Sequence, residues 1–406
     1  MTCPSLPSSR ASSSHQAVPK ISLLSIVLLL LFIHHTFGCD FSLPNEKPCL
    51  DWSYSEANQW AQQCPNSQCG GSSQSPVPIL SFQNIISYDQ YLLQALYNNG
   101  SNPNTLPSLL YDFSNETKRS LTIHGLFQEM SKNSLDFTLL NSGHTIMLSL
   151  NETSSAMKQP VYIDRYFLVR ETSTSSSFNK NLPFRPSSVA LKVPGYNSIR
   201  VPYRLKQFHF HTPSEHVFNW FSYDLEVHFV FQREDLEKAL DALVPRITVV
   251  GVVLQALGMI DHPLIDVVVR NKDYLMKHVG KPVNTREVTS GMLFDMVPLR
   301  QELDPLFSYF VYNGSLTTPN CNENVMWNVV NPNIFLGASQ YISLNQMAAL
   351  RQIMNQAQHG KRENSSKVRG LSSSTGDNMT STDNGFLGNN RPLQSLNGRK
   401  IISITR

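Results

Sequence analysis

Two stretches of the sequence, QFHFHTPSEH (residues 207–216) and YDLEVHFVF (residues 223–231), indicate a β-sheet protein with a metal site. In an extended strand, residues i and i+2 project from the same face, so His209 and His211 point one way and Phe208 and Phe210 the other. If the second run pairs alongside as a strand, His228 supplies a third imidazole. Three neutral imidazoles hold Zn²⁺ with one position open, as in catalytic rather than structural zinc sites.

An H-x-H pair alone has an ordinary alternative, because most such pairs in strands are core or half-exposed histidines. The neighbouring residues favour the metal site. Gln207 and Glu226 each lie two positions before a candidate ligand, on the same buried face. Buried polar side chains cost free energy unless they hydrogen-bond, and a metal-binding histidine needs an acceptor for its other ring N–H. We therefore predict that these two side chains are such acceptors.

Length and composition describe a folded protein without a nucleic-acid partner. The 406 residues can bury a sizeable core, and 41% hydrophobic with 16% charged residues is typical of a globular chain. The net charge is +3. The segment from Lys361 onward contains eight basic and three acidic residues, so positive and negative charges are nearly equal in number in the preceding part of the chain. No long basic stretch suggests binding to a phosphate backbone.

The N-terminus has the pattern of an export signal. The apolar run of 13 residues from Ile21 to Ile33 is shorter than the about 20 residues of a membrane span. We expect residues 1–38 to be a signal peptide, cleaved after Gly38, which makes the protein secreted or luminal. The alternative is an uncleaved signal anchor. No second apolar run follows, so no stable membrane span is expected once the leader is removed.

Cysteines and glycosylation triplets agree with export. Loss of the leader removes Cys3 and leaves an odd set, in which we expect disulfides rather than metal ligands: Cys39, Cys49, Cys64, Cys69 and Cys321. One of the five must stay free, pair between chains or leave with the leader. Asn-x-Ser/Thr triplets, any one of which can occur by chance, begin at Asn99, Asn115, Asn151, Asn364 and Asn378.

The rest of the chain reads as one sheet-dominated domain. Runs with strand character occupy residues 120–124, 136–140, 144–150, 162–169, 204–211, 225–232 and 247–255. Helical patterns cover residues 88–97 and 345–358, and a further helical face lies within 233–243. We expect inserted loops near residues 98–118, 170–190, 233–245 and 361–384.

With these motifs the chain resembles the alpha-carbonic anhydrases. The matching blocks, in the order of that family, are QSPV (74–77), NSGH (141–144), QFHFH (207–211), LEVHFV (225–230), VVGVVL (249–254), YNGSLTTPNC (312–321), MW (326–327) and NNRPLQSLNGR (389–399). The resemblance implies an α+β, sheet-dominated single domain over residues 39–401, with a short tail at 402–406. It also implies a central, mostly antiparallel twisted sheet of about ten strands, with zinc at the base of a conical cleft.

The resemblance also implies roles for individual residues. The three histidines are expected to bind Zn²⁺, with Gln207 and Glu226 as their outer partners. Thr317 is expected to accept the hydrogen of a zinc-bound hydroxide and to donate its own to Glu215, with Thr318 at the bicarbonate position. An apolar wall for CO2 is expected from Val230, Val249, Leu316 and Trp327.

His144 matches the proton-shuttle position of the family, and its alternative role is that of an exposed loop histidine. Ser142 and Met147 depart from the asparagines that usually line the water path in vertebrate members. Asn320 replaces a proline. A disulfide between Cys69 and Cys321 resembles that of extracellular members.

The implied activity is that of a hydro-lyase: reversible hydration of CO2 to bicarbonate and a proton by zinc-bound hydroxide. An alternative from another class is a catalytically silent carbonic-anhydrase-related module for binding or matrix formation. Silent members of the family have usually lost a ligand histidine, whereas this chain has histidine at all three ligand positions. The triplet at Asn313 is expected to stay unmodified, because a glycan there would crowd the metal loop.

Overall fold

β-Strands are the commonest regular structure among the described residues of this chain, as the sequence predicts. The computed structural model describes Cys49 and residues 52–81, 85–87, 90, 105–108, 134–151, 162–170, 196–233, 244–296, 308–332, 340–366 and 388–405. All of them belong to one compact unit that begins at Cys39. The expected signal peptide lies outside the described residues, as do the expected strand at 120–124 and most of the expected helices at 88–97 and 233–243.

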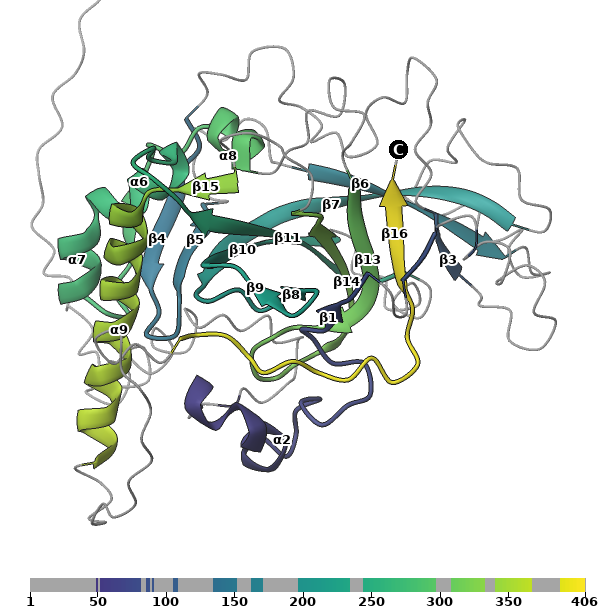
Figure 1. Ribbon diagram of the computed structural model, residues 1–406, viewed down its shortest axis with the longest axis horizontal. Coiled ribbons are helices and arrows are strands. Elements are labelled where there is room, and N and C mark those ends of the chain that lie inside the picture. The colour runs from purple at the N-terminus through teal and green to yellow at the C-terminus, as the bar shows by residue number, and fades with distance from the viewer. Residues whose placement is uncertain are drawn as a thin grey trace, which may run out of the picture. The chain divides into compact units, whose positions relative to one another are not determined.

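The main sheet contains 13 strands among the described residues, and ten of them form the continuous order β12-β4-β5-β7-β10-β11-β14-β13-β16-β2 (Figure 1). The remaining strands β3, β6 and β15 join it at the side, and β1, β8 and β9 form a separate small sheet. The strands of the main sheet are β2 (Ile85–Ser87), β3 (Thr105–Ser108), β4 (Phe137–Asn141), β5 (Ile146–Leu150), β6 (Tyr162–Arg170), β7 (Tyr196–His211), β10 (Leu225–Arg233), β11 (Ile247–Ala256), β12 (Val283–Thr285), β13 (Ser308–Ser315), β14 (Glu323–Val330), β15 (Tyr341–Ile342) and β16 (Ile401–Thr405). Those of the small sheet are β1 (Pro78–Ile79), β8 (Val217–Phe218) and β9 (Phe221–Ser222).

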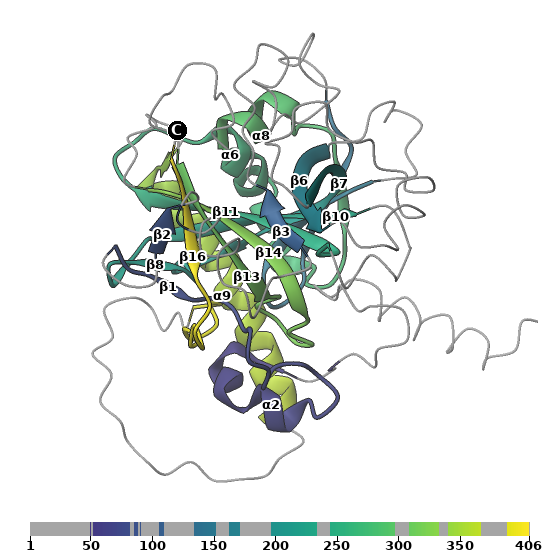
Figure 2. The same cartoon turned by 90° about the vertical axis from the view of Figure 1, so that its right-hand side faces the viewer.

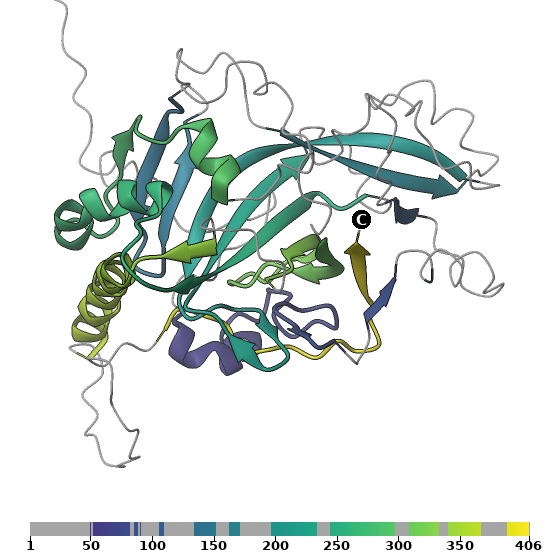
Figure 3. The ribbon, with the colours of Figure 1, turned by 45° about the horizontal axis from the view of Figure 1, so that its top comes forward.

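Most neighbouring strands run antiparallel, so the expected sheet-dominated, mostly antiparallel fold is confirmed. The parallel pairs are β11 with β14 and β15, β16 with β2, and β1 with β8. Strand β7 has 16 residues and serves two regions of the sheet. Its N-terminal part pairs with β6, which extends away from the centre (Figure 3), and its C-terminal part pairs with β5 and β10.

Helices cover one end of the sheet. Helix α9 (Leu344–Ser366) packs with α6 (Pro263–Arg270) and α7 (Lys272–Lys277) beside β4, and α8 (Ser290–Met296) packs on α6 (Figure 1). Near the N-terminus, the 3-10 helix η1 (Tyr54–Gln59) leads directly into the short helix α2 (Trp60–Gln63), shown in purple in Figure 2. No helix among the described residues is long and apolar enough to cross a membrane.

The two faces of the central strands bury different side chains. Phe208, Phe210 and Phe229 are buried in the larger core, which also contains apolar residues of α6 and α9. Val230 and Val249 belong to a second cluster on the opposite face. Full burial of one such apolar side chain stabilises the fold by about 1.5–3 kcal/mol, so both faces hold the central strands in register. Phe208 and Phe210 of β7 therefore point away from His209 and His211, as their alternation predicts.

Three expectations about chain segments need correction. The expected short tail at 402–406 is wrong, because Ile401–Thr405 forms β16, whose alternating isoleucines pack into the two cores while the strand pairs with β13 and β2. Helix α9 continues past residue 358 to Ser366, so the expected inserted loop at 361–384 begins as helix. The expected loop near 98–118 contains strand β3, which pairs with β6. Local composition misses such pairings, because a distant strand provides the partner.

Candidate metal centre

Three imidazoles converge on one face of β7 and β10. His209 and His211 come from β7, and His228 stands directly opposite His209 on β10. One ring nitrogen from each lies within 4.8 Å of one from each of the others, and all three residues are buried. Their ring centroids are 4.4–5.2 Å apart. The structure thus brings together the three histidines that the two sequence stretches single out.

Each of the three rings has its outward nitrogen fixed by an acceptor. Gln207 Oε1 lies 2.8 Å from His209 Nδ1, and Glu226 Oε1 lies 2.9 Å from His228 Nε2. The third acceptor is a backbone carbonyl: His211 Nδ1 lies 2.7 Å from the oxygen of Asn389. These contacts leave Nε2 of the two β7 histidines and Nδ1 of the β10 histidine directed to a common centre. Such outer partners set the tautomer and orientation of metal-binding histidines.

The three rings fit a divalent metal ion. His211 Nε2 is buried and has no hydrogen-bond partner among the described residues, which is costly unless something else occupies it. Burial lowers the pKa of His211 to about 4 and lowers the pKa of His209 and His228 as well, and repulsion between the protonated rings adds to the effect for the latter two. The neutral imidazole is the form that binds metal. Three nitrogen donors without a thiolate match a zinc site with an open position.

Glu226 is the most heavily used acceptor of the site. Its Oε2 accepts the backbone N–H groups of Glu215 and His216, both at 2.8 Å, and its Oε1 also contacts His216 Nδ1 at 2.7 Å. Burial by itself would raise the pKa of this carboxyl, but His216 and His228 hold it well below the usual range. The carboxylate is therefore ionised. Gly251 leaves the room that it needs, because a Cβ there would come within 3.0 Å of Glu226 Oε1.

His216 packs within the domain, as expected. Together with Glu226 and His228 it also forms a second cluster whose ligand atoms are close enough to hold a metal ion. Its Nδ1 contacts the carboxylate, and its Nε2 lies 2.7 Å from the hydroxyl of Tyr312. That hydroxyl in turn hydrogen-bonds to Ser75 Oγ at 3.0 Å. Both ring nitrogens are thus occupied by protein, so this group is a hydrogen-bond network that supports the three converging rings.

Glu215 lies beside the converging rings with its carboxyl buried. Its Oε1 accepts the backbone N–H of Arg391 at 2.8 Å. Burial raises the pKa of Glu215 to about 7, while His228 and the hydroxyl of Thr317 oppose the rise. Thr317 therefore lies where the resemblance expects it, next to this carboxyl.

A pocket opens beside the three rings. It is lined by His209, His228 and Gln207, by the apolar side chains Val230, Val249, Leu316 and Trp327, and by Thr317 and Thr318. These are the residues expected for the apolar wall and for the two threonine positions. Trp327 is held by a hydrogen bond from its Nε1 to the carbonyl of Ser315, 2.9 Å away. The lining therefore combines apolar side chains with imidazole, amide and hydroxyl groups.

His144 is half-buried and stacked, which differs from an exposed loop histidine. Its ring lies parallel to that of Trp52, with centroids 3.8 Å apart and planes 10° apart. Its backbone is held by Ser142 Oγ, which accepts its N–H at 3.2 Å, and by Asn389 Nδ2, which donates to its carbonyl at 3.1 Å. Met147 is buried in β5 and pairs with His209.

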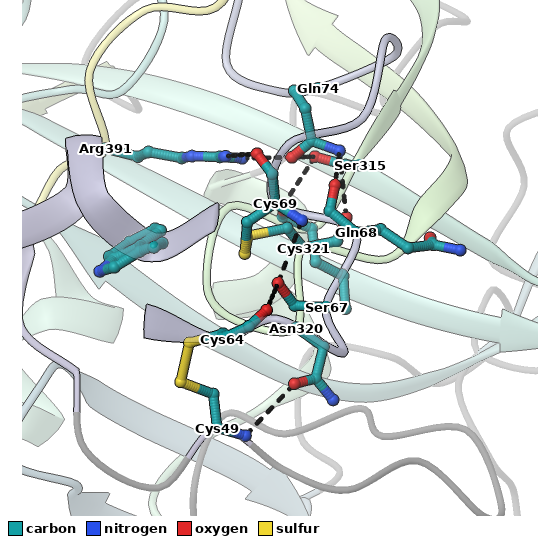
Figure 4. Close-up of a disulfide and its surroundings, with 12 residues drawn as sticks. Cys49, Cys64, Ser67, Gln68, Cys69, Gln74, Ser315, Asn320, Cys321 and Arg391 are labelled. Atoms are coloured by element: carbon teal, nitrogen blue, oxygen red, sulfur yellow. Dashed lines mark hydrogen bonds between the residues drawn. A yellow bond between two sulfur atoms is a disulfide. The ribbon is translucent and has the colours of Figure 1, made fainter. Parts of the chain in front are cut away.

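Two disulfides lie near the site. Cys69–Cys321 forms as expected and joins the N-terminal segment to the loop that carries the two threonines. Cys49–Cys64 resolves part of a pairing that the sequence left open, and Cys39 lies outside the described residues. Figure 4 shows both bridges, with Asn320 placed to reach Cys49.

Some residues of the site carry no readable signal in the sequence. Toward His211 and Glu215, Asn389 and Arg391 act through a backbone carbonyl and a backbone N–H, which any residue type can supply, although their side chains make further hydrogen bonds nearby. Trp52 is remote in sequence from the histidine that it contacts. Gly251 lies within a quoted block, and a glycine inside a buried strand is a sign of close approach that could have been used.

Fold and site together define a protein with a mixed β-sheet that carries a three-histidine candidate metal centre beside an apolar pocket. The family model described as eukaryotic-type carbonic anhydrase matches residues 112–405. This chain therefore belongs to the eukaryotic-type carbonic anhydrase family. The alpha-carbonic anhydrases are zinc-dependent, and the three-histidine cluster agrees with that property.

Individual relatives are similar over part or most of their length. The chain is 34% identical to dioscorin DB3L of Dioscorea polystachya over 39% of its own length and 48% of that protein. It is 24% identical to carbonic anhydrase 6 of Mus musculus over 72% of both chains. It thus spans about half the length of the first of these relatives. Among solved structures, the alpha-carbonic anhydrase from Thermovibrio ammonificans with sulfanilamide has a TM-score of 0.46 and 21% identity, over 88% of this chain and 100% of that one.

Proposed function

We propose that this protein catalyses the reversible hydration of CO2 to bicarbonate and a proton, with Zn²⁺ held by His209, His211 and His228. The observation that carries the proposal is the set of three buried rings whose outward nitrogens have acceptors, while Nε2 of His211 has no hydrogen-bond partner in the described part of the chain. Bound Zn²⁺ would supply Lewis acidity and a water pKa of about 7, a value established for carbonic anhydrase itself rather than obtained from this structure.

The residues around the rings have separate tasks in this proposal. Gln207, Glu226 and the carbonyl of Asn389 keep the three rings in the tautomer that leaves the inward nitrogens unprotonated. Because these acceptors are fixed before any ligand arrives, little reorganisation is needed when the metal binds.

Glu215 and Thr317 orient the attacking oxygen. The backbone N–H of Arg391 fixes one oxygen of Glu215, so the carboxyl is held in place to accept the hydroxyl proton of Thr317. A threonine whose proton is committed in this way can only accept a hydrogen bond from the nucleophile. That restriction directs the lone pair of the nucleophile into the pocket.

The apolar wall would hold CO2 without hydrogen-bonding it. Val249, Val230 and Leu316 are buried and line the pocket with Trp327. A linear, uncharged substrate gains little from polar contacts, so an apolar surface that excludes water next to the nucleophile suits it. Thr318, which also lines this pocket, would donate a hydrogen bond to a bicarbonate oxygen.

His144 would carry the proton away. An imidazole that titrates near neutrality can accept a proton and release it to buffer. The hydroxyl of Ser142 is committed to its own turn, because it donates to the carbonyl of Thr145 at 3.0 Å and accepts backbone N–H groups. Ser142 is therefore poorly suited to bind a water chain, and we expect transfer through His144 to depend on the position of its ring.

Stopped-flow CO2 hydration on purified, zinc-assayed full-length protein tests the proposal. We expect one zinc per chain and hydration well above buffer. His228→Ala should lose both zinc and activity while remaining soluble, whereas His278→Ala, which changes a histidine outside the site, should keep both. A wild type that holds one zinc yet shows no hydration would support the silent binding module instead, and stoichiometric zinc in His228→Ala would refute the ligand assignment.

We also propose that the protein is exported. Its two disulfides are of a kind that persists in oxidising compartments. The apolar run before Gly38 is the expected signal. N-terminal sequencing of the secreted protein should begin near Cys39, and retention of residues 1–38 on a membrane fraction would favour the signal anchor.

A further inference from the structure

A disulfide-closed loop near the N-terminus carries three aromatic rings that pack on one another. Cys49 and Cys64 are bridged, and between them lie Trp52, Tyr54 and Trp60. The ring of Trp52 packs edge-to-face on both of the others: its centroid is 5.3 Å from that of Tyr54 and 5.2 Å from that of Trp60. We call these three residues the aromatic cap.

The aromatic cap contacts the candidate metal centre from outside. Trp52 stacks on His144, and the ring of Tyr54 meets His211 edge-on at 6.3 Å. The third ring of the cap packs under the guanidinium of Arg391, 5.5 Å from its centroid. Each ring of the cap therefore touches a different residue of the site, so a shift of the cap would be felt there.

Local structure alone gives the aromatic cap little support. Helices η1 and α2 have six and four residues, and neither has a side-chain hydrogen bond at its N-cap. Helices this short are unstable in isolation, because nucleation is costly. The loop thus depends on its crosslink, on its ring contacts and on the hydrogen bond that Trp60 Nε1–H donates to the carbonyl of Ser53, 3.0 Å away, to keep one conformation.

The crosslink is in turn tied to the loop that carries Thr317 and Thr318. Cys49 N–H donates to Asn320 Oδ1 at 3.3 Å, and Gln68 N–H donates to the carbonyl of Asn320 at 2.9 Å (Figure 4). Asn320 is buried and stands directly before Cys321, which forms the second bridge. A proline, which the resemblance leads one to expect at this position, has no side-chain acceptor for the Cys49 N–H.

We propose that the Cys49–Cys64 disulfide is a positioning device that fixes Trp52 against His144 and so determines where this imidazole sits. The backbone of His144 is anchored separately, by Ser142 and Asn389. Loss of the crosslink therefore acts on the ring and not on the loop that carries it. The positional claim stands on the ring contacts, and only its kinetic consequence rests on the proposed function.

The test uses zinc-loaded, full-length protein with ¹³C-labelled histidine. The His144 ring signal, assigned with His144→Gln, should be displaced upfield by the ring current of Trp52. Trp52→Leu should abolish this displacement, and the double variant Cys49→Ser/Cys64→Ser should move the signal most of the way to the same value. Trp220→Phe, at the exposed β8–β9 turn, serves as the matched control and should leave the signal unchanged.

Kinetics provide the second measurement. In dilute buffer the double variant should lose kcat severalfold while kcat/KM and zinc content stay at wild-type values, and imidazole should restore the loss. An unmoved His144 signal in the double variant would overturn the proposal. So would loss of zinc, because the disulfide would then be a staple of the whole fold. Absence of hydration in the wild type would refute the proposed function, yet the histidine signals would still decide the positioning role.

Discussion

Replacement of Glu226 by glutamine should weaken zinc binding by reversing the tautomer of a ligand. The carboxylate accepts on both oxygens: Oε2 from the backbone N–H groups of Glu215 and His216, and Oε1 from the rings of His216 and His228. Glutamine has the same shape but only one acceptor oxygen, because its other terminal group is a donor. One side of the network must therefore lose its acceptor.

The two orientations of the new amide differ in cost. If its NH2 faced the backbone, two buried N–H donors would lose their acceptor, at about 1–3 kcal/mol each, a large share of the about 5–15 kcal/mol of a typical fold. If the NH2 faces the rings, His228 must accept on Nε2 and carry its proton on Nδ1, the nitrogen directed to the centre. We expect the second orientation and a loss of about 10–100-fold in zinc affinity, the range for such outer partners.

Competition against a chelator on the demetallated, refolded protein measures this loss. Gln207→Glu is the matched control, because it exchanges one acceptor for another at His209 and should keep the affinity within a factor of a few. Melting of the demetallated variants checks that both remain folded. Wild-type zinc affinity in a folded Glu226→Gln variant would show that this carboxylate does not set the tautomer, and the reasoning would fail.

Three further predictions concern the proton path, the pocket and acid stability. His144→Ala should lower kcat about 10²-fold with kcat/KM unchanged and recover with imidazole buffer, whereas an unchanged kcat would remove its role. Val249→Phe should lower kcat/KM by about 10-fold or more with zinc retained, because it fills the pocket, while Val249→Ala keeps the pocket open. Burial lowers the pKa of His262 to about 4. As the pH falls below about 6.5, this histidine is therefore protonated in the unfolded state but still neutral in the folded state. The free energy of unfolding should drop by about 3 kcal/mol by pH 4. His262→Asn, which keeps an acceptor for the Leu264 N–H at the start of α6, should remove this part of the acid dependence in urea titrations, and an unchanged dependence would contradict it.

The central strands could be predicted from the sequence because their signal is local. Residues 225–232 and 247–255 match β10 and β11 to within one residue, since dense β-branched and aromatic runs identify buried strands by themselves. Strand β7 begins at Tyr196, eight residues before the expected Arg204, because its N-terminal part is extended by pairing with β6. Helix α6 was missed, although His262 followed by Pro263 is a usable start signal.

The candidate site likewise contains residues that the sequence predicts and residues that it does not. The three rings and the side-chain acceptors Gln207 and Glu226 follow from spacing within two strands, because alternation fixes which face each side chain occupies. Asn389 is 178 residues from the ring that its carbonyl supports, and a backbone acceptor leaves no mark on the residue type. The stack of Trp52 on His144 likewise depends on a crosslinked loop whose path no local pattern specifies.

The three acceptors also differ in charge, and the difference bears on reactivity. Gln207 offers an amide oxygen and Asn389 a peptide carbonyl, so both are neutral, and only Glu226 is ionised. A negative acceptor strengthens the basicity of the ring that it holds, and every added negative charge would weaken the pull of a bound cation on its water. One charged acceptor, itself shared with His216 and two backbone N–H groups, fixes a tautomer while passing little charge to the centre. The backbone donors around Glu226 would therefore tune a metal ion bound by these histidines as well as support the fold.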